Sequence, residues 1–514
     1  MCFAQFMTML DSTIVNVALP SLQRELHTTP ETLQWTIDAY VLTTAALILL
    51  GGKLGDRFGR KRMFLIGLAI FTLASAACAL STDDEQLVVF RAVQATGGAL
   101  LSPLSLSILV AAFPRKRLPA AIGIWAGISG IGLSAGPLIG GLLVEHFSWS
   151  AVFWVNVPIG TVAVGVCLWA VAESRDERHR HLDVVGTGLV TAGLFVLVFA
   201  LIGTNSHPWT SARTVGLLAV AAVLLATFLR WEQRNADPML PLQFFHRPAF
   251  ATSTTVALLV SFAFFGVLYL LVIYLQNVKG YSPLQAGVRT LPLTLTQALI
   301  AATAGRLDRK LGARIKMSVG MLVLSIGLLG MAQIHVASSY NAIWPFLVLL
   351  GLGMGMAIPA VSAAAMADVD EDRAGIAAGV VNSARHVGSA LGIAVLGSVV
   401  ATLARDDWHR HLSLLAPPAQ AKATHLTRLV LDGQGRLIGK IAGRPAQEAA
   451  LESFVHGVQG ALITGSALAF IGSAVAFVGL RGFRPGRRFL EGGHRLEPVA
   501  GEASAQKRTT TADF

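Results

Sequence analysis

Residues 52–62 read GKLGDRFGRKR and lie between two long apolar blocks. This stretch is short, strongly basic and punctuated by glycine, which is typical of a tight turn between two membrane-spanning helices. A second stretch, GRLDRKLGAR at residues 305–314, repeats the pattern with one gap. The two copies predict a chain built from duplicated halves, each with this turn after its second helix.

Composition assigns the chain to the membrane class. Of its 514 residues 54% are hydrophobic and only 13% are charged, whereas soluble domains carry about 25% charged residues. The stretches 186–203 and 342–365 contain no charged side chain, and each approaches or exceeds the roughly 20 residues that a helix needs to cross a bilayer. No segment shows the alternation of a membrane β-barrel. We therefore expect an all-α polytopic membrane protein.

The apolar blocks predict about 14 spans. We expect them near residues 1–20, 36–54, 62–80, 87–112, 119–144, 150–172, 184–203, 213–231, 250–276, 285–305, 315–334, 341–366, 374–404 and 457–481. The separation of the two basic turns leaves room for six helices and two more between them. We therefore predict a six-helix half at 1–172, two inserted helices at 173–249, and a second six-helix half at 250–481 followed by a basic tail at 482–514.

Lys and Arg set the orientation of these helices. Most of them lie in alternate short loops, and the intervening short loops carry only Arg24, Arg213 and Lys279. Because basic loops stay cytoplasmic, both termini are expected inside the cell and a long loop at 405–456 outside. The formal charge of +11 then reflects topology, which disfavours nucleic-acid binding. The first 20 residues read as a span and not as a cleaved leader.

Four further stretches carry a family resemblance. They are LDSTIVNVALP at 10–20, RAVQATGGA at 91–99, GLSAGPLIGG at 132–141, and YLQN with YSPLQAG between 274 and 287. Together with the turn at 52–62 they resemble the major facilitator superfamily, specifically its 14-helix drug:proton antiporter branch of the EmrB/QacA type. Ala95 replaces the usual glycine of the fourth-helix motif, and His386 follows Arg385 where relatives often have Gln.

The resemblance implies a major-facilitator fold and a secondary active transporter of the plasma membrane. It would export small lipophilic or cationic compounds, such as drugs or antibiotic-like metabolites, in exchange for protons. The alternatives are a metabolite symporter or uniporter of the same fold, or a membrane sensor or enzyme without transport. The sequence contains no recognisable nucleotide-binding loop or nucleophile constellation, and its three cysteines lack metal spacing. We therefore expect no enzyme activity, metal or cofactor, with the proton gradient as energy source; the oligomeric state stays open.

Ionisable residues inside apolar spans are functional candidates, because a charge at the bilayer centre costs about 2.5–3.5 kcal/mol on insertion scales. Asp11 is predicted to be a protonatable site whose pKa Arg91 modulates; the alternative is a permanent structural pair. Asp38 is predicted to be a second proton site, a wall residue that attracts cations, or a hydrated residue near the surface.

Two glycine-rich regions are predicted to act in conformational change. The basic turns would form a gating latch in which Asp56 opposes the start of the helix near Ala374 and Gly375; the alternative is that they only fix topology. The latch residues are Gly52, Asp56, Arg57, Gly59, Arg60, Asp308 and Arg309. In the fifth helix Gly132, Gly136 and Gly140 share one ridge that permits close helix packing, and Pro137 should kink the helix. The link of this helix to antiport is implied by the resemblance alone.

Substrate contact is predicted for a set of polar and aromatic residues expected near a central cavity. Arg385 would line this cavity or pair with a carboxylate of the other half, and Arg289 is expected to snorkel toward the interface. The full set is Asn16, Trp35, Tyr40, Phe265, Tyr269, Gln276 and Arg385.

Overall fold

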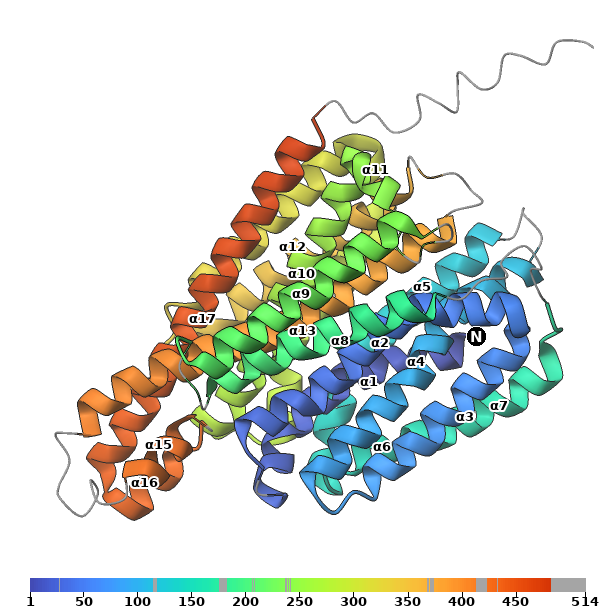
Figure 1. Ribbon diagram of the computed structural model, residues 1–514. Coiled ribbons are helices and arrows are strands. Elements are labelled where there is room, and N and C mark those ends of the chain that lie inside the picture. The colour runs from blue at the N-terminus through green and yellow to red at the C-terminus, as the bar shows by residue number, and fades with distance from the viewer. Residues whose placement is uncertain are drawn as a thin grey trace, which may run out of the picture. The chain divides into compact units, whose positions relative to one another are not determined.

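The computed structural model describes residues 1–481 except 27, 114–117, 175–182, 206, 208, 236–237, 239, 241, 368, 370–373, 413–422 and 432. Residues 1–481 form one compact unit, separate from 482–514. Within the described residues every regular element is a helix (Figure 1). Several helices begin at side-chain caps, as where Asp83 accepts the N–H of Gln86 at 2.8 Å and Ser282 forms a capping box with Gln285.

The region predicted to be the first half is helical along most of its length. It comprises α1 (Cys2–Glu25), α2 (Pro30–Phe58), α3 (Arg60–Ala79), α4 (Asp84–Ala112), α5 (Leu118–His146) and the closely spaced pair α6 (Ala151–Trp154) and α7 (Asn156–Ala170). Helix α1 packs against α5, and α4 packs against both α2 and α3. These packings bury the polar face of α1 against α4 and α7.

The two inserted helices form a hairpin alongside both halves. They are α8 (Val184–Ile202), which ends in the short helix η1 (Gly203–Asn205), and α9 (Ala212–Arg234). Helix α8 packs against α9, α2 and α13, and the two inserted helices run side by side in Figure 1. Because α2 and α13 belong to different halves, the hairpin contacts both.

The second half follows the same order. It comprises η2 (Leu242–His246), α10 (Pro248–Ile273), the π-helical turn η3 (Tyr274–Val278), α11 (Pro283–Met331), α12 (Tyr340–Met366), α13 (Ala374–Leu412) and α17 (Arg444–Gly479). The halves meet where α11 packs on α5 and α13 packs on α2.

The duplicated basic turns adopt the same bend. The second helix of the first half ends at Gly59, with φ 106°, and α11 breaks at Gly312, with φ 67°. Each glycine lies seven residues after the first glycine of its turn, and this left-handed region favours glycine. Gly312 therefore separates the two expected spans that α11 contains, and both halves turn at the same place.

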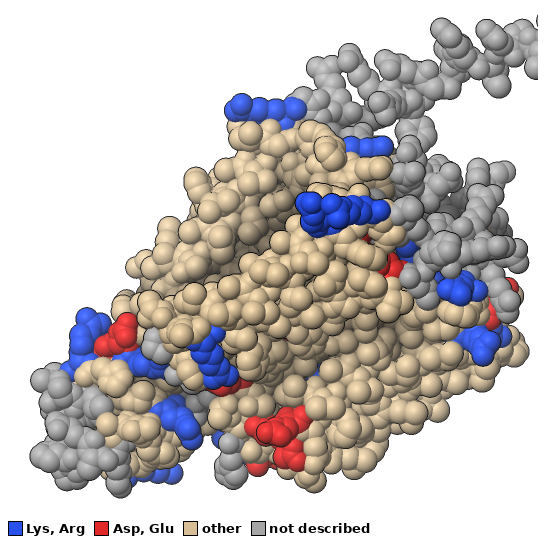
Figure 2. All heavy atoms as spheres, in the orientation of Figure 1, with Lys and Arg blue, Asp and Glu red and all other residues tan. Residues whose placement is uncertain are grey.

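The helix surfaces suit a bilayer. Twelve helices among the described residues are long and apolar enough to cross a membrane. Large apolar side chains such as Leu73, Trp169 and Phe470 are exposed on them, as expected of lipid-facing positions. Figure 2 shows a broad uncharged band on one face, with Lys, Arg, Asp and Glu toward its ends. Helix α2 and the part of α11 before Gly312 are not among these twelve candidate spans. The expected number of 14 spans therefore stays a prediction.

The region 405–456, expected to be a loop, is largely helical in its described part. Helix α13 continues to Leu412, α15 (Ala423–Leu431) and α16 (Gly435–Ala442) follow, and α17 begins at Arg444. Trp408 is fully buried in a small separate core with Leu426, Val430 and Ile438. The long-loop prediction is therefore wrong in its local structure, because this apolar cluster stabilises short amphipathic helices that their polarity and brevity concealed.

Candidate functional site

A buried ion pair lies between α1 and α4. The Nη1 atom of Arg91 is 2.6 Å from Oδ2 of Asp11, and these side chains are 1% and 0% exposed. The guanidinium also donates to the carbonyl of Thr36 at 3.1 Å and lies 4.2 Å from the ring centroid of Tyr40. The arginine therefore has a carboxylate, a carbonyl and an aromatic face as partners, which together compensate its removal from water.

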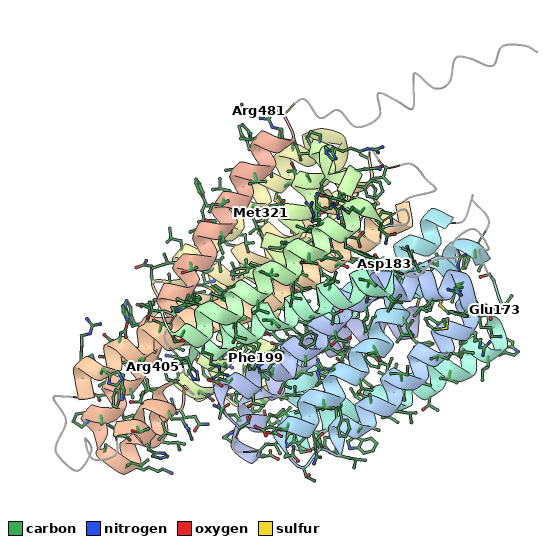
Figure 3. The ribbon with its side chains drawn as sticks, viewed as in Figure 1. Glu173, Asp183, Phe199, Met321, Arg405 and Arg481 are labelled. Carbon is green, nitrogen blue, oxygen red and sulfur yellow. The ribbon has the colours of Figure 1, made fainter. Side chains whose placement is uncertain are left out.

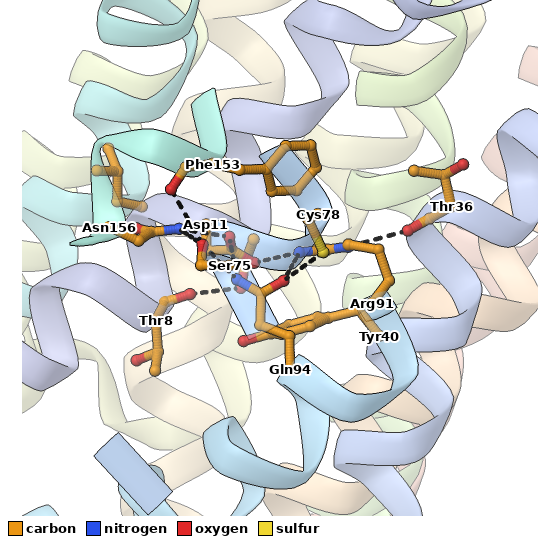
Figure 4. Close-up of polar contacts among 12 residues, drawn as sticks. Thr8, Asp11, Thr36, Tyr40, Ser75, Cys78, Arg91, Gln94, Phe153 and Asn156 are labelled. Carbon is orange, nitrogen blue, oxygen red and sulfur yellow. Dashed lines mark hydrogen bonds and ion pairs between the residues drawn. The ribbon is translucent and has the colours of Figure 1, made fainter. Parts of the chain in front are cut away.

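The second oxygen of Asp11 is held by neutral amides (Figure 4). Oδ1 accepts hydrogen bonds from Nε2 of Gln94 at 3.0 Å and from Nδ2 of Asn156 at 2.9 Å. Both amides also donate to Oγ of Ser75, and the Oε1 atom of Gln94 accepts from Arg91 at 2.7 Å. Side chains of α1, α3, α4 and α7 thus form one connected polar network around the carboxyl group of Asp11.

Local sequence explains why these groups converge. Arg91 and Gln94 are three residues apart, so they project from the same face of α4. Asn156 is the first residue of α7, directly after the short break that follows α6. Asp11 and its neighbours Leu10 and Thr13 on α1 are buried, whereas Ser12 is partly exposed. The sequence prediction identified Asp11 and Arg91 but not Gln94, Asn156 or Ser75.

Asp38 differs from Asp11 in its surroundings. Its side chain is 0% exposed, and within the described residues neither carboxylate oxygen has a hydrogen-bond partner. This burial contradicts the interpretation of Asp38 as a hydrated residue near the surface. An ionised carboxylate buried without partners is costly, which distinguishes the surroundings of Asp38 from those of Asp11.

The glycine ridge of α5 packs against α1 as predicted. A Cβ on Gly132 would lie 2.7 Å from the carbonyl oxygen of Phe6, and one on Gly140 would lie 2.9 Å from that of Ile14. A Cβ on Gly136 would collide with Thr13, whose Oγ1 donates to the carbonyl of Leu133 at 3.1 Å. On the next turn, the carbonyl of Pro137 meets Gly287 of α11. Helix α5 is therefore in close contact with α1 and with the other half.

The predicted latch is partly described. Gly59 forms the turn, Arg57 is exposed with its guanidinium 5.1 Å from the ring centroid of Phe58, and Gly52 lies beside Pro103 of α4. The backbone N–H of Arg60 donates to the carbonyl of Ser174 at 2.9 Å. The side chains of Asp56, Asp308 and Arg309, and the partner positions Ala374 and Gly375, lie outside the described residues.

Glu173 contacts the basic turn and was not identified from the sequence. Its carboxylate accepts the backbone N–H groups of Lys61 at 3.0 Å and Arg62 at 3.1 Å. It therefore caps the positive end of α3 from the far end of the first half. Acidic residues are common beside helix ends, so the sequence did not indicate that Glu173 would contact α3.

The predicted cavity set does not converge on one place. Gln276 in η3 donates to the carbonyl of Val17 at 2.9 Å, next to Asn16 on α1. The side-chain oxygens of Gln276 and Asn16 are buried and have no hydrogen-bond partner within the described part of the chain. Tyr40 belongs to the Arg91 network. Trp35 instead stacks on Phe195 of α8, with ring centroids 6.0 Å apart, a packing contact with the inserted hairpin.

The remaining members lie in the second half. Phe265 packs edge-on against Phe264. Tyr269 lines a cavity of about 370 Å³ together with Gln34, Arg405 and Arg428. Arg385 donates to Oγ of Ser362 at 2.9 Å, and no carboxylate among the described residues lies within ion-pair distance of it. Arg289 lies over the ring of Tyr281 at 3.9 Å, near the helix end as expected.

A polytopic bundle of two similar helical halves, with a charged network buried inside one half, is typical of membrane transporters. The family comparison agrees, because residues 1–393 match the model of the Major Facilitator Superfamily. The chain belongs to the Major Facilitator Superfamily. It is therefore a multi-pass membrane protein that acts on a small-molecule substrate.

Several relatives are similar over most of their length. The tetracenomycin C resistance and export protein of Streptomyces glaucescens is 37% identical over 472 residues, which cover 90% of this chain and 88% of that protein. The multidrug resistance protein Stp of Mycobacterium tuberculosis is 36% identical, covering 90% and 87%. The methylenomycin A resistance protein of Streptomyces coelicolor is 34% identical, covering 80% and 86%. All three are named for resistance to antibiotics or drugs.

Solved structures share the fold. A bacterial homologue of the human lysosomal transporter Spinster, in an inward-facing and unoccupied conformation, superposes with a TM-score of 0.66 over 94% of this chain and 96% of that one. The sequence identity is 18%, so this similarity concerns architecture alone.

Proposed function

We propose that this transporter exports small lipophilic or cationic compounds, drugs or antibiotic-like metabolites, across the plasma membrane in exchange for protons. Two kinds of evidence support export: the names of the relatives, and the glycine ridge of α5 that resembles the antiporter motif. Positive-inside topology supports a cytoplasmic position for both termini.

The observation that carries proton coupling is the buried contact between Asp11 and Arg91. With the guanidinium and two amides around it, the Asp11 carboxylate is stable without a proton. A movement of α4 relative to α1 would remove the cation and leave the carboxylate buried. The carboxylate would then bind a proton, and the return movement would displace that proton again. Alternate exposure of the two sides would turn this cycle into antiport.

Asp38 would serve as a second proton site with the opposite preference. Since its buried oxygens have no hydrogen-bond partner among the described residues, a proton would neutralise it in the present conformation. Opening of the neighbouring interface between α2 and α13 would admit water and allow the proton to leave. The two carboxylates would then load and release protons in different conformations.

Asp11→Asn tests the coupling role, because asparagine retains the size and shape of the side chain but does not titrate. Purified protein in proteoliposomes with an imposed pH gradient should lose gradient-driven substrate accumulation by 10-fold or more, on the order of a missing general acid or base. The exposed Glu85→Gln on α4 is the matched control. Undiminished gradient-driven transport by folded Asp11→Asn would leave only the structural pair.

The same assay separates the alternatives of direction. Antiport requires substrate to move against the proton flow, so reversing the gradient reverses net transport. Accumulation with the proton flow would instead identify a symporter, and transport insensitive to the gradient would identify a uniporter.

A further inference from the structure

A second pair of carboxyl groups meets at the base of the inserted hairpin. Asp183 caps the first turn of α8, and Glu232 lies on the last turn of α9; the two side chains are 6% and 3% exposed. Figure 3 shows Asp183 at the opposite end of α8 from Phe199. The charge pattern of the loops places this end on the cytoplasmic side. Neither residue belongs to the network around Asp11.

Asp183 is surrounded by hydrogen-bond donors. Its Oδ1 accepts the backbone N–H of Gly186 at 2.7 Å and the indole N–H of Trp231 at 2.9 Å. Its Oδ2 accepts Nδ2 of Asn235 at 2.9 Å. Both oxygens of Asp183 therefore act as hydrogen-bond acceptors.

Glu232 has one satisfied oxygen and one unsatisfied oxygen. Oε2 accepts the backbone N–H of Leu240 at 3.1 Å, whereas Oε1 is buried without a hydrogen-bond donor among the described residues. Oε1 lies beside Asp183, because a Cβ on Gly186 would be 3.0 Å from Oε1 of Glu232 and still closer to Oδ2 of Asp183. Two carboxyl groups can hydrogen-bond to each other only when one of them carries a proton.

We propose that Asp183 and Glu232 form a proton-binding site in which Oε1 of Glu232 carries one proton and donates it to Asp183. The shared proton ties α9, and the chain at Leu240 beyond it, to the start of α8. This site is separate from the transport site and does not rest on the proposed antiport.

Loss of this proton to the cytoplasm would place two negative charges side by side in a buried position. Two groups favour the ionised form of Glu232. They are Lys53, in the basic turn at the end of α2, and the backbone N–H of Leu240. The like charges would repel, since each is within a few ångströms of the other and shielded from water. The base of the hairpin would loosen next to the end of α2, and the site would report alkaline cytoplasmic pH.

Glu232→Gln provides the sharpest test, because an amide can donate to Asp183 and accept from Leu240 but holds no proton to lose. We would measure the infrared carbonyl band of protonated carboxyl groups in the purified full-length protein at neutral pH. A component of this band should be present in the wild type and in the Glu85→Gln control and absent in Glu232→Gln. Its presence at equal strength in Glu232→Gln would overturn the proposal.

Thermal unfolding gives a second readout that does not depend on transport. Between mildly acidic and alkaline buffer, the wild-type Tm should fall, because the folded state must give up a proton that holds it together, and Glu232→Gln should fall measurably less. Equal falls in both proteins would contradict the proposal. So would a sodium-dependent rise in Tm that Glu232→Gln abolishes, since it would show that a cation and not a proton occupies the site.

Discussion

Nδ2 of Asn156 lies 2.9 Å from Oδ1 of Asp11, although 145 residues separate them in the sequence. This bond attaches the start of α7 to the middle of α1. It is also the second amide hydrogen bond to Oδ1 of Asp11, whose other oxygen forms the ion pair with Arg91. The contacts of Asp11 therefore depend on the position of α7 as well as on that of α4.

Asn156→Ala should destabilise the protein and weaken proton-coupled transport. A hydrogen bond to a charged group contributes about 1.5–3 kcal/mol, and Asn156→Asp should be worse because it places a second negative charge beside Asp11. Thermal unfolding of purified protein measures both. The exposed Thr161→Val on the same helix is the control. A variant Asn156→Asp as stable as the wild type at neutral pH would disprove the network as described.

Gly132→Ala and Gly130→Ala form a matched pair on α5. The first places a Cβ 2.7 Å from the carbonyl of Phe6, and the second places a Cβ where nothing lies within 4 Å. Overpacking against a backbone atom typically costs about 1–3 kcal/mol, while alanine in an open helical position is favoured by up to about 1 kcal/mol over glycine. We expect Gly132→Ala to lower Tm and folded yield, and Gly130→Ala to preserve them.

If both alanine variants behaved alike, the ridge would not be a packing surface. A selective loss of transport in Gly132→Ala, with normal stability, would instead indicate that the α1–α5 contact moves during the cycle.

Glu145→Ala should favour opening between the halves on the side opposite the basic turns. The carboxylate of Glu145 lies at the end of α5 and accepts two hydrogen bonds from the start of α11. The donors are the hydroxyl of Ser282 at 2.5 Å and the backbone N–H of Leu284 at 3.0 Å. Exposed bonds of this kind contribute about 0.5–1.5 kcal/mol each, so the open population should rise several-fold.

The opening can be measured with a cysteine at position 284. Labelling of Leu284→Cys by a membrane-impermeant maleimide, in a background without Cys2, should be several-fold faster when Glu145→Ala is added. Glu85→Ala, at an exposed carboxylate of α4, should leave the rate unchanged. A slower rate in Glu145→Ala would mean that this contact stabilises the open form.

Sequence patterns predicted most of the fold because membrane helices can be recognised from the length of their apolar segments and from the positions of Lys and Arg between them. The turn at Gly59 and its counterpart at Gly312 were recognisable as a repeat, since a left-handed bend between charged residues needs glycine. Asp11, Arg91 and Asp38 stood out because each is charged within an apolar block.

The partners of these residues were not predictable to the same degree. Ser75, Gln94 and Asn156 are uncharged, and such residues occur in membrane helices without a specific role. Gln94 could have been inferred from its position three residues after Arg91, and Asn156 from being the only amide in its block. Glu145 and Glu173 gave no such signal, because each accepts hydrogen bonds from a helix start more than 100 residues away. Glu232 gave none because its proximity to Asp183 depends on the packing of α8 against α9.

The helical block around Trp408 has a practical consequence. Helices α13 and α17 run without interruption from the second half into this block. Within the block, Nε1 of Trp408 donates a hydrogen bond of 3.1 Å to Thr427. We therefore expect the block to move as a rigid extension of the second half. An antibody fragment raised against α15 and α16 would add mass for image alignment. Tilts of the second half would be magnified at its far end, so the same fragment would serve as a pointer for sorting particles by conformation.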